Sequence, residues 1–327
     1  MKSKLLIPVV AVLLLAAPAV SLFAQDYNMS SVESDMENIV AGLSDFFGTN
    51  LGGMSYICDP VGNAFIKNFT IGAAGGAVLV PVEDLSFPEG TAMDIDFGDM
   101  GYIPVPGVGA YAKFSLKKLE FGAKLAGFPT YETDDGTIKV QNMIIGGKVR
   151  YKLTGFNFLL MKGGISVGAL YEYMNGGLEI YQSDGFPVYA DEIDSTWPHE
   201  VAATVTTDAT INNTWSAHTL GGEAQANFQV LFLNFFVGSR LSKTLGSATS
   251  DFEGETTLTA EPDYEPYITE ETQIIGPYSS ETEPPGVDIY GFGGVEFRLF
   301  IFTIGARGSY NFTDQALAVD GGVRLQF

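Results

Sequence analysis

Apolar and polar residues alternate along much of this chain with a period of two. From Leu317 to Phe327 the odd positions are apolar or glycine, while the even positions include Asp320, Arg324 and Gln326. Successive side chains of a β-strand point to opposite faces, so this pattern predicts a strand with one apolar and one polar face. The segments with this pattern lie at about 69–82, 108–115, 118–125, 142–153, 161–173, 220–230, 233–242, 287–299, 302–312 and 317–327. We therefore expect ten strands, or twelve if a long connection contains another hairpin. The first strand, mostly Gly, Ala and Val, has an ambiguous facing.

The connections between these segments alternate in length. The short ones lie around 116–118, 154–157, 231–232 and 300; the long ones are 83–103, 129–137, 175–213 and 244–286, with a shorter one near 313–316. Outer-membrane β-barrels have short periplasmic turns and long extracellular loops. The alternation therefore predicts an all-β fold, a transmembrane antiparallel β-barrel with both chain ends in the periplasm. Residues 176–190 and 201–211 could extend strands outside the membrane. A soluble β-sandwich, with its apolar positions in a core, is the alternative.

The segment before the first strand has helical spacing instead. Apolar residues recur every three or four positions from Val32 to Phe47, and Gly48 or the pair Gly52–Gly53 can end the helix. We expect a short amphipathic helix of about four turns within residues 25–64. Two placements stay open. The helix could plug the lumen with its acidic face, or it could pack on the periplasmic mouth or in the interface.

The first residues have the pattern of a secretory signal peptide. Lys2 and Lys4 precede an apolar run from Leu5 to Val20, and Ala24 offers a small residue for cleavage. An uncleaved membrane anchor is the alternative. No later stretch reaches the roughly 18 apolar residues of a transmembrane helix. The expected organisation is a signal peptide over 1–24, an N-terminal periplasmic or plug segment over 25–64, and an outer-membrane barrel with acidic extracellular loops over 65–327.

The distribution of charge adds to this picture. The chain has 327 residues, 39 of them acidic and 17 basic, a formal net charge of −22 at pH 7, and a single cysteine. This balance excludes a nucleic-acid binder, which needs a basic face, and the lone Cys58 excludes a disulfide framework. The four long connections hold 26 of the 39 acids and no Lys or Arg. We therefore expect the acidity to be extracellular.

Most basic residues fall instead on the polar positions of the strands, which should face the lumen. Several acids share these positions. The lumen-lining candidates are Lys113, Lys124, Lys148, Arg150, Lys152, Lys162, Glu172, Glu223, Arg240, Glu296, Arg298, Arg307 and Arg324. Two interpretations stay open: an internal network of ion pairs that fills a narrow barrel, or a selective path for a substrate. Barrels of eight strands are filled by side chains and those of sixteen to eighteen strands hold a water channel, so ten strands allow at most a narrow path.

The last strand carries a resemblance. Its alternating apolar residues and terminal Phe327 resemble the C-terminal strand of Gram-negative outer-membrane β-barrel proteins, the superfamily to which this ending points. The resemblance implies that the barrel-assembly machinery recognises this strand, with Phe327 as the assembly signal. Aromatic residues near the strand ends fit the two interfacial girdles of such barrels. The order of helix then barrel also resembles, weakly, the FadL-like transporters of hydrophobic compounds with their N-terminal hatch.

These observations favour a membrane protein without enzymatic activity. The leading hypothesis is passive or gated passage of a small solute or hydrophobic compound. The alternative is a non-transporting surface protein, an adhesin or structural protein, that acts through acidic extracellular loops. The expected partners are outer-membrane lipid, the assembly machinery and a possible small solute; no cofactor and no metal are expected.

Two further groups of residues, the histidines and an aspartate cluster, bear on possible chemistry. His199 lies in a long connection and His218 on an apolar strand position that points outward, so neither indicates a catalytic base. Asp94, Asp96 and Asp99 offer oxygen ligands at the spacing of a calcium loop, although their order departs from the EF-hand pattern. A solvated acidic surface is the simpler interpretation of these aspartates.

Overall fold

The computed structural model describes residues 29–55, 58, 69–81, 102–133, 136–189, 202–260 and 271–327. It contains one helix and eleven strands in these residues. The elements are α3 (Met29–Ser55), β1 (Phe69–Pro81), β2 (Tyr102–Leu116), β3 (Leu119–Glu132), β4 (Ile138–Phe158), β5 (Met161–Tyr189), β6 (Ala202–Val230), β7 (Leu233–Ala260), β8 (Glu271–Thr282), β9 (Asp288–Leu299), β10 (Phe302–Asn311) and β11 (Leu317–Gln326). Residues 1–28, which include the predicted signal peptide, lie outside the described residues. The described helix does not contain a stretch that is both long and apolar enough to cross a membrane.

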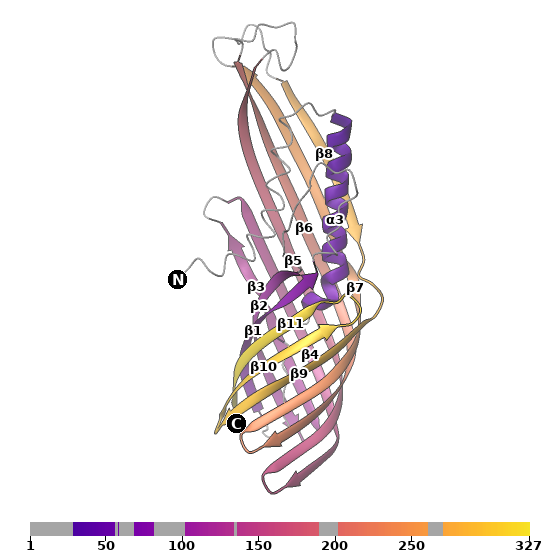
Figure 1. Ribbon diagram of the computed structural model, residues 1–327, viewed down its shortest axis with the longest axis vertical. Helices are drawn as coiled ribbons and strands as arrows, with labels where there is room; N and C mark the ends of the chain where they lie inside the picture. Colours follow the sequence, from indigo (N-terminus) through magenta and orange to yellow (C-terminus); the bar gives the residue numbers. More distant parts are fainter. Residues whose placement is uncertain are drawn as a thin grey trace.

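Ten of the strands form a closed antiparallel ring (Figure 1). Each pairs with its neighbour in sequence, except that β7 pairs with β9, and β11 returns to β1. The last residue completes this seam, since the backbone N–H of Phe327 donates to the carbonyl of Phe69 at 2.9 Å. The prediction of a ten-stranded barrel is confirmed. Strand β8 lies outside the ring and pairs with the distal part of β7.

Burial alternates along the strands as the sequence pattern predicts. In β4, Asn142, Lys148 and Arg150 are buried while Ile145 and Val149 are exposed. The exposed residues are apolar, and they cover the outside of the ring. The facing of β1 is now decided, because Thr70, Val78 and Val80 face inward while Ile71 faces outward. The core of this protein is therefore the filled interior of the barrel, and its outer surface is apolar, as lipid requires.

Three strands continue far beyond the barrel. β5, β6 and β7 have 28 or 29 residues, whereas β9, β10 and β11 have 10 to 12. β7 pairs with β9 only as far as Ser242, yet it continues to Ala260, roughly 60 Å farther along the strand at 3.3 Å per residue. We call the parts of β5, β6 and β7 that lie beyond the closed ring, together with β8, the extension (Figure 1). Much of the connections 175–213 and 244–286 is therefore strand, in agreement with the possibility that strands extend outside the membrane.

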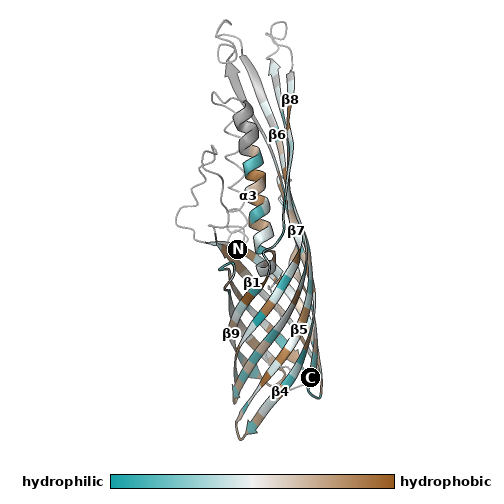
Figure 2. Ribbon diagram, turned by 90° about the vertical axis from the view of Figure 1, so that its right-hand side faces the viewer, coloured by the Kyte–Doolittle hydropathy of each residue, from teal (hydrophilic) through white to brown (hydrophobic). Residues whose placement is uncertain are grey.

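Helix α3 runs along the extension, and its C-terminal end enters the barrel mouth (Figures 1 and 2). The helix lies at the end opposite the short turns. If the short turns lie in the periplasm, as the sequence pattern predicts, this end is expected to face the outside of the cell. The C-terminal end of the helix lies among the strands of this mouth, and the side of the membrane that it faces stays a prediction.

The helix is also longer than its glycines indicate. It has 27 residues and passes through Gly48, Gly52 and Gly53 without ending. A β-carbon at Gly48 would lie 2.8 Å from the side chain of Thr282, and one at Gly52 would collide with the carboxylate of Asp288. The glycines therefore allow the helix to approach the barrel closely, and this tertiary contact outweighs their low helix propensity.

Candidate functional site

Buried ion pairs fill the interior of the barrel. Glu172 of β5 accepts Lys124 Nζ at 2.6 Å and Arg240 Nη2 at 2.8 Å, and the side chains of all three are at most 3% exposed. They come from β3, β5 and β7, so the ion pairs link three strands across the lumen. An inward position on a strand is the only place in the membrane-spanning ring where these charges avoid lipid.

A second group lies beside the first. Glu223 of β6 accepts Lys148 Nζ at 2.8 Å and Arg150 Nε at 2.9 Å, and Arg150 also lies 3.4 Å from Glu120. Arg150 and Glu120 are direct cross-strand partners, as are Arg240 and Glu223. The register of the ring therefore places Glu120 and Glu223 opposite bases, which compensates buried charges that would otherwise be strongly unfavourable.

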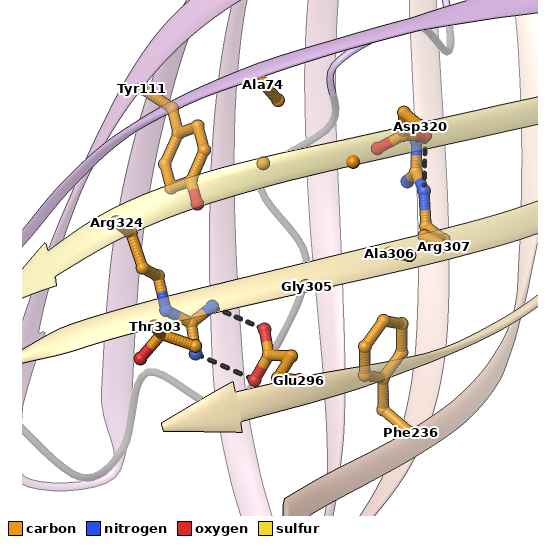
Figure 3. A pocket seen from close by; sticks show the side chains of 12 residues that line it. Ala74, Tyr111, Phe236, Glu296, Thr303, Gly305, Ala306, Arg307, Asp320 and Arg324 are labelled. Carbon is orange, nitrogen blue, oxygen red and sulfur yellow. Dashed lines mark hydrogen bonds and ion pairs between the residues drawn. The ribbon is translucent and has the colours of Figure 1, made fainter. Parts of the chain in front are cut away.

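A third group closes the part of the lumen formed by the C-terminal strands (Figure 3). Arg324 binds Glu296 through two contacts of 2.6 and 2.8 Å, and Asn234 donates to the same carboxylate at 2.8 Å. Arg307 donates through Nε and Nη2 to one oxygen of Asp320, its cross-strand partner, at 2.9 and 2.5 Å. These three groups together are the ion-pair network.

A small cavity lies between Arg324–Glu296 and Arg307–Asp320. Its volume is about 40 Å³, and Tyr111 and Phe236 also line it (Figure 3). A water molecule needs about 10 to 15 Å³ of such volume, so the cavity has room for two or three waters. This cavity is therefore too small to hold an organic solute.

Above the ion-pair network, α3 seals the mouth with apolar side chains. Phe47 stacks on Trp215 of β6 with ring centroids 5.0 Å apart and planes 14° apart. The indole N–H of Trp215 donates to Asn142 Oδ1 at 3.2 Å, which fixes the ring. We call the buried residues around this pair the apolar seal. Its other members include Phe46, Leu51, Met54, Val78, Val80, Ile144, Met174, Ala217, Tyr290 and Phe292.

Polar contacts fix the C-terminal end of the helix to the barrel. Lys124 Nζ donates to the carbonyl of Ser55 at 2.9 Å, while the same lysine binds Glu172. The C-terminus of a helix carries a partial negative charge that a cation stabilises. Ser44 donates to the carbonyl of Ala248 at 3.2 Å. Lys124 therefore connects the helix directly with the ion-pair network.

Of the thirteen predicted lumen residues, ten are buried, and the other three lie near the short turns. The buried ones are Lys113, Lys124, Lys148, Arg150, Glu172, Glu223, Arg240, Glu296, Arg307 and Arg324. Lys152 and Arg298 are half-buried, and Lys162 is exposed at the rim. Arg298 donates to Gln326 at the same end.

Sequence reasoning missed the apolar seal. Ile144, Met174 and Trp215 face inward although the predicted inner face is polar. A signal was present at two of them, because Ile144–Ile145 and Tyr173–Met174 are pairs of adjacent apolar residues within an alternating strand. Such a pair makes both faces of the strand apolar at that level.

The outward side of the extension forms a second distinct surface, which we call the acidic face. It is rich in carboxylates and hydroxyls from four adjacent strands. The carboxylates are Glu179, Asp208, Asp251, Glu253, Glu255 and Glu281. The hydroxyls are Tyr181, Thr210, Thr214, Ser216, Thr249, Thr257, Thr272 and Ser279. At the edge of the face, Lys139 lies 3.4 Å from Glu179 in an exposed pair.

The remaining candidates offer no site in the described residues. His218 points outward, where its ring contacts Tyr171 and Tyr173 and its Nδ1 lies 2.8 Å from the Tyr171 hydroxyl. His199, Asp94, Asp96 and Asp99 lie outside the described residues. Within the described residues no three His, Cys, Asp or Glu side chains gather as metal ligands would.

Comparison with known proteins finds structural neighbours only. No protein-family model and no curated protein sequence matches the chain. Solved structures that resemble it include the outer-membrane protease OmpT from Escherichia coli, at 8% identity over 82% of this chain and 99% of that chain, with a TM-score of 0.34. Another is the translocator domain of the autotransporter NalP from Neisseria meningitidis, at 9% identity over 85% and 95%, with a TM-score of 0.29. A third is the CymD monoaromatic hydrocarbon channel, at 8% identity over 80% and 89%, with a TM-score of 0.26.

The class of this protein rests on its own geometry. The ring of ten strands is closed, its outside is apolar, and its charges face inward. A closed barrel with this distribution satisfies every requirement of a membrane-spanning sheet. The fold is that of a transmembrane β-barrel.

Proposed function

We propose that this protein is a closed outer-membrane barrel that holds a recognition surface, the acidic face, outside the cell for a cationic macromolecule. The observation that carries the proposal is the extension itself. Three strands continue beyond the barrel, β8 pairs with β7 there, and α3 packs along one side of this sheet. A conduit has no need of such a structure, whereas a surface that must be presented rigidly does.

The contacts of α3 support a rigid extension. Met36, Ile39 and Val40 of the helix are buried against Ile211 and Phe252 of the sheet. Apolar contacts support the sheet on one side and leave its other side, the acidic face, open to solvent. The helix therefore supports the extension and also blocks the mouth of the barrel.

The state of the lumen supports a closed barrel. A solute would meet the apolar seal first and the ion-pair network next. Breaking a buried ion pair by displacing one partner costs about 3–5 kcal/mol, so movement of α3 alone would leave the passage obstructed. These two successive barriers favour the surface protein over passage of a solute.

The chemistry of the acidic face determines the class of partner. Six carboxylates from β5 to β8 lie on one side of one sheet, with hydroxyls between them. Complementary charge steers association and selects partners. A polypeptide or other polymer with regularly spaced amines fits this surface, because hydroxyl oxygens and carboxylates accept the hydrogen bonds that ammonium groups donate.

Binding to immobilised poly-L-lysine tests the acidic face. The variant Asp251→Asn, Glu253→Gln, Glu255→Gln should bind at least tenfold more weakly than the parent, and parent binding should fall as salt rises. The matched control is Glu37→Gln, Asp45→Asn, Glu132→Gln, which neutralises three exposed or helix-side acids elsewhere. Equal loss in both variants would mean that only net charge matters, and the proposal of a specific face would be wrong.

Gated passage of a small solute is the second candidate. The observation in its favour is that α3, which blocks the mouth, is not part of the barrel wall. The helix can therefore move out of the mouth without opening the ring of strands. Planar-bilayer conductance of the intact protein and of a Phe47→Asp, Leu51→Asp variant decides between the two. The closed barrel predicts no ion passage in either form. Discrete channels in the variant would support gating instead.

A further inference from the structure

The end of the barrel opposite α3 has an unusual surface. Four short connections lie there, and three of them consist of large apolar residues. We call these connections the turn rim. They are Leu116–Leu119, Phe158–Met161, Val230–Leu233 and Leu299–Phe302. Phe300 is 93% exposed and Leu159 is 83% exposed, the highest values among the large apolar side chains of the described residues.

These apolar residues stand where turn chemistry favours others. Two-residue hairpin turns require positive φ and are usually built from Gly, Asn or Asp. Here the first residue of each turn is Lys117, Leu159, Leu231 or Phe300, with φ between 47° and 56°. A left-handed backbone conformation is sterically unfavourable for such bulky residues. The turns thus combine backbone strain with exposed apolar surface, and an apolar environment would remove the second of these penalties.

The turn rim is continuous with the surface that already faces lipid. Phe232 of one turn contacts Phe297 of the wall with ring centroids 5.0 Å apart, and Phe156 contacts Phe228 at 6.2 Å. All four rings are exposed. At the Phe232–Phe297 contact no polar side chain lies between turn and wall, so the apolar band of the barrel continues into this turn.

Among the described residues, the exposed charged side chains at this end are of one sign. Lys117, Lys118 and Lys162 are exposed, and Lys118 lies with its Nζ 5.9 Å from the ring centre of Tyr151. The described acidic side chains nearest in sequence, Glu120 and Glu296, are buried in the lumen. Lysines beside apolar residues are typical of an interface with anionic lipid, where the stem lies along the apolar region and the ammonium group reaches the phosphates.

We propose that the turn rim is seated in an anionic phospholipid leaflet. The apolar turns enter the region of the acyl chains, and Lys117, Lys118 and Lys162 bind the lipid phosphates. The barrel end therefore does not project into the aqueous periplasm. Continuity with the lipid-facing wall and the basic charge of the rim select lipid over a water-soluble partner.

Fluorescence quenching tests this placement. A Phe300→Trp variant of the full chain is reconstituted in bilayers of phosphatidylcholine with 30% phosphatidylglycerol, with bromine on the acyl chains of one lipid at a time, and the signal of the parent's two native tryptophans is subtracted. The proposal predicts a blue-shifted emission that brominated acyl chains quench. Leu159→Trp, on another turn, replaces this variant if its folding, judged by gel mobility before boiling, is impaired.

The headgroup part of the proposal has its own readout. Brominated phosphatidylglycerol should quench more strongly than brominated phosphatidylcholine. This preference for the anionic lipid should fall by about fivefold with each of the substitutions Lys117→Gln, Lys118→Gln and Lys162→Gln. The control is Lys139→Gln, Lys243→Gln, which removes exposed lysines away from the rim and should leave the preference unchanged.

Three results would overturn the proposal. Emission typical of tryptophan in water, without quenching, would place the rim in the aqueous phase. Quenching that is equal for both lipids and unaffected by the lysine variant would remove the role of the phosphates. Emission that is blue-shifted but unquenched, together with a dimer in sedimentation, would mean that a second copy covers the rim.

Discussion

Glu223 is the residue through which the stability of the ion-pair network can be measured. Its carboxylate lies 2.8 Å from Lys148 and 2.9 Å from Arg150, and its side chain is 2% exposed. At an effective dielectric constant of about 20, each of these contacts has a Coulomb energy of roughly 6 kcal/mol before desolvation is counted. Desolvation offsets much of this. Removal of one partner of a buried ion pair, which leaves the other charge uncompensated, costs about 3–5 kcal/mol.

The Glu223→Gln variant should therefore lose about 3–5 kcal/mol of unfolding free energy, because glutamine keeps the shape and removes the charge. Urea unfolding of the reconstituted barrel, followed by tryptophan fluorescence, measures this loss. The control is Glu179→Gln, which breaks the exposed pair with Lys139, where both side chains are nearly half exposed, and should change stability by less than about 1 kcal/mol. If both variants shift the unfolding curve by the same small amount, the ion-pair network does not stabilise the closed barrel.

Three further predictions concern the helix and the seam. Phe47→Ala removes a buried ring and should cost about 3–5 kcal/mol, seen as faster amide hydrogen exchange in α3; unchanged protection would contradict its role in the apolar seal. Gly52→Ala places a methyl group against the Asp288 carboxylate and should destabilise the docked helix by about 1–3 kcal/mol in urea unfolding, whereas parental stability would mean that the helix can shift. Deletion of Phe327 removes its hydrogen bond and ring contact with Phe69, so folding into lipid, followed by gel mobility, should slow; an unchanged rate would exclude this contact from the folding barrier.

The sequence by itself determines the barrel. Side chains along a strand alternate between two faces, and in a membrane barrel one face contacts lipid and the other the lumen. Because a charged residue avoids lipid, its position indicates which way the residues next to it point. Arg150, Glu223 and Arg307 could therefore be placed inside from their positions alone. The short turns and the closing strand follow from the same local pattern, because they need only adjacent residues.

Only the tertiary structure decides which charges meet and where α3 lies. Glu172 contacts Lys124 and Arg240, which are 48 and 68 residues away, and these partners follow from the shear of the closed ring rather than from any local pattern. Likewise, glycine at position 52 would by itself predict the end of a helix. In the structure the helix continues through Gly52, and the missing side chain lets α3 approach Asp288, which lies 236 residues later in the sequence. Packing between distant segments thus overrides local propensity, because burial of an apolar helix face in a barrel mouth stabilises the helix more than a glycine weakens it.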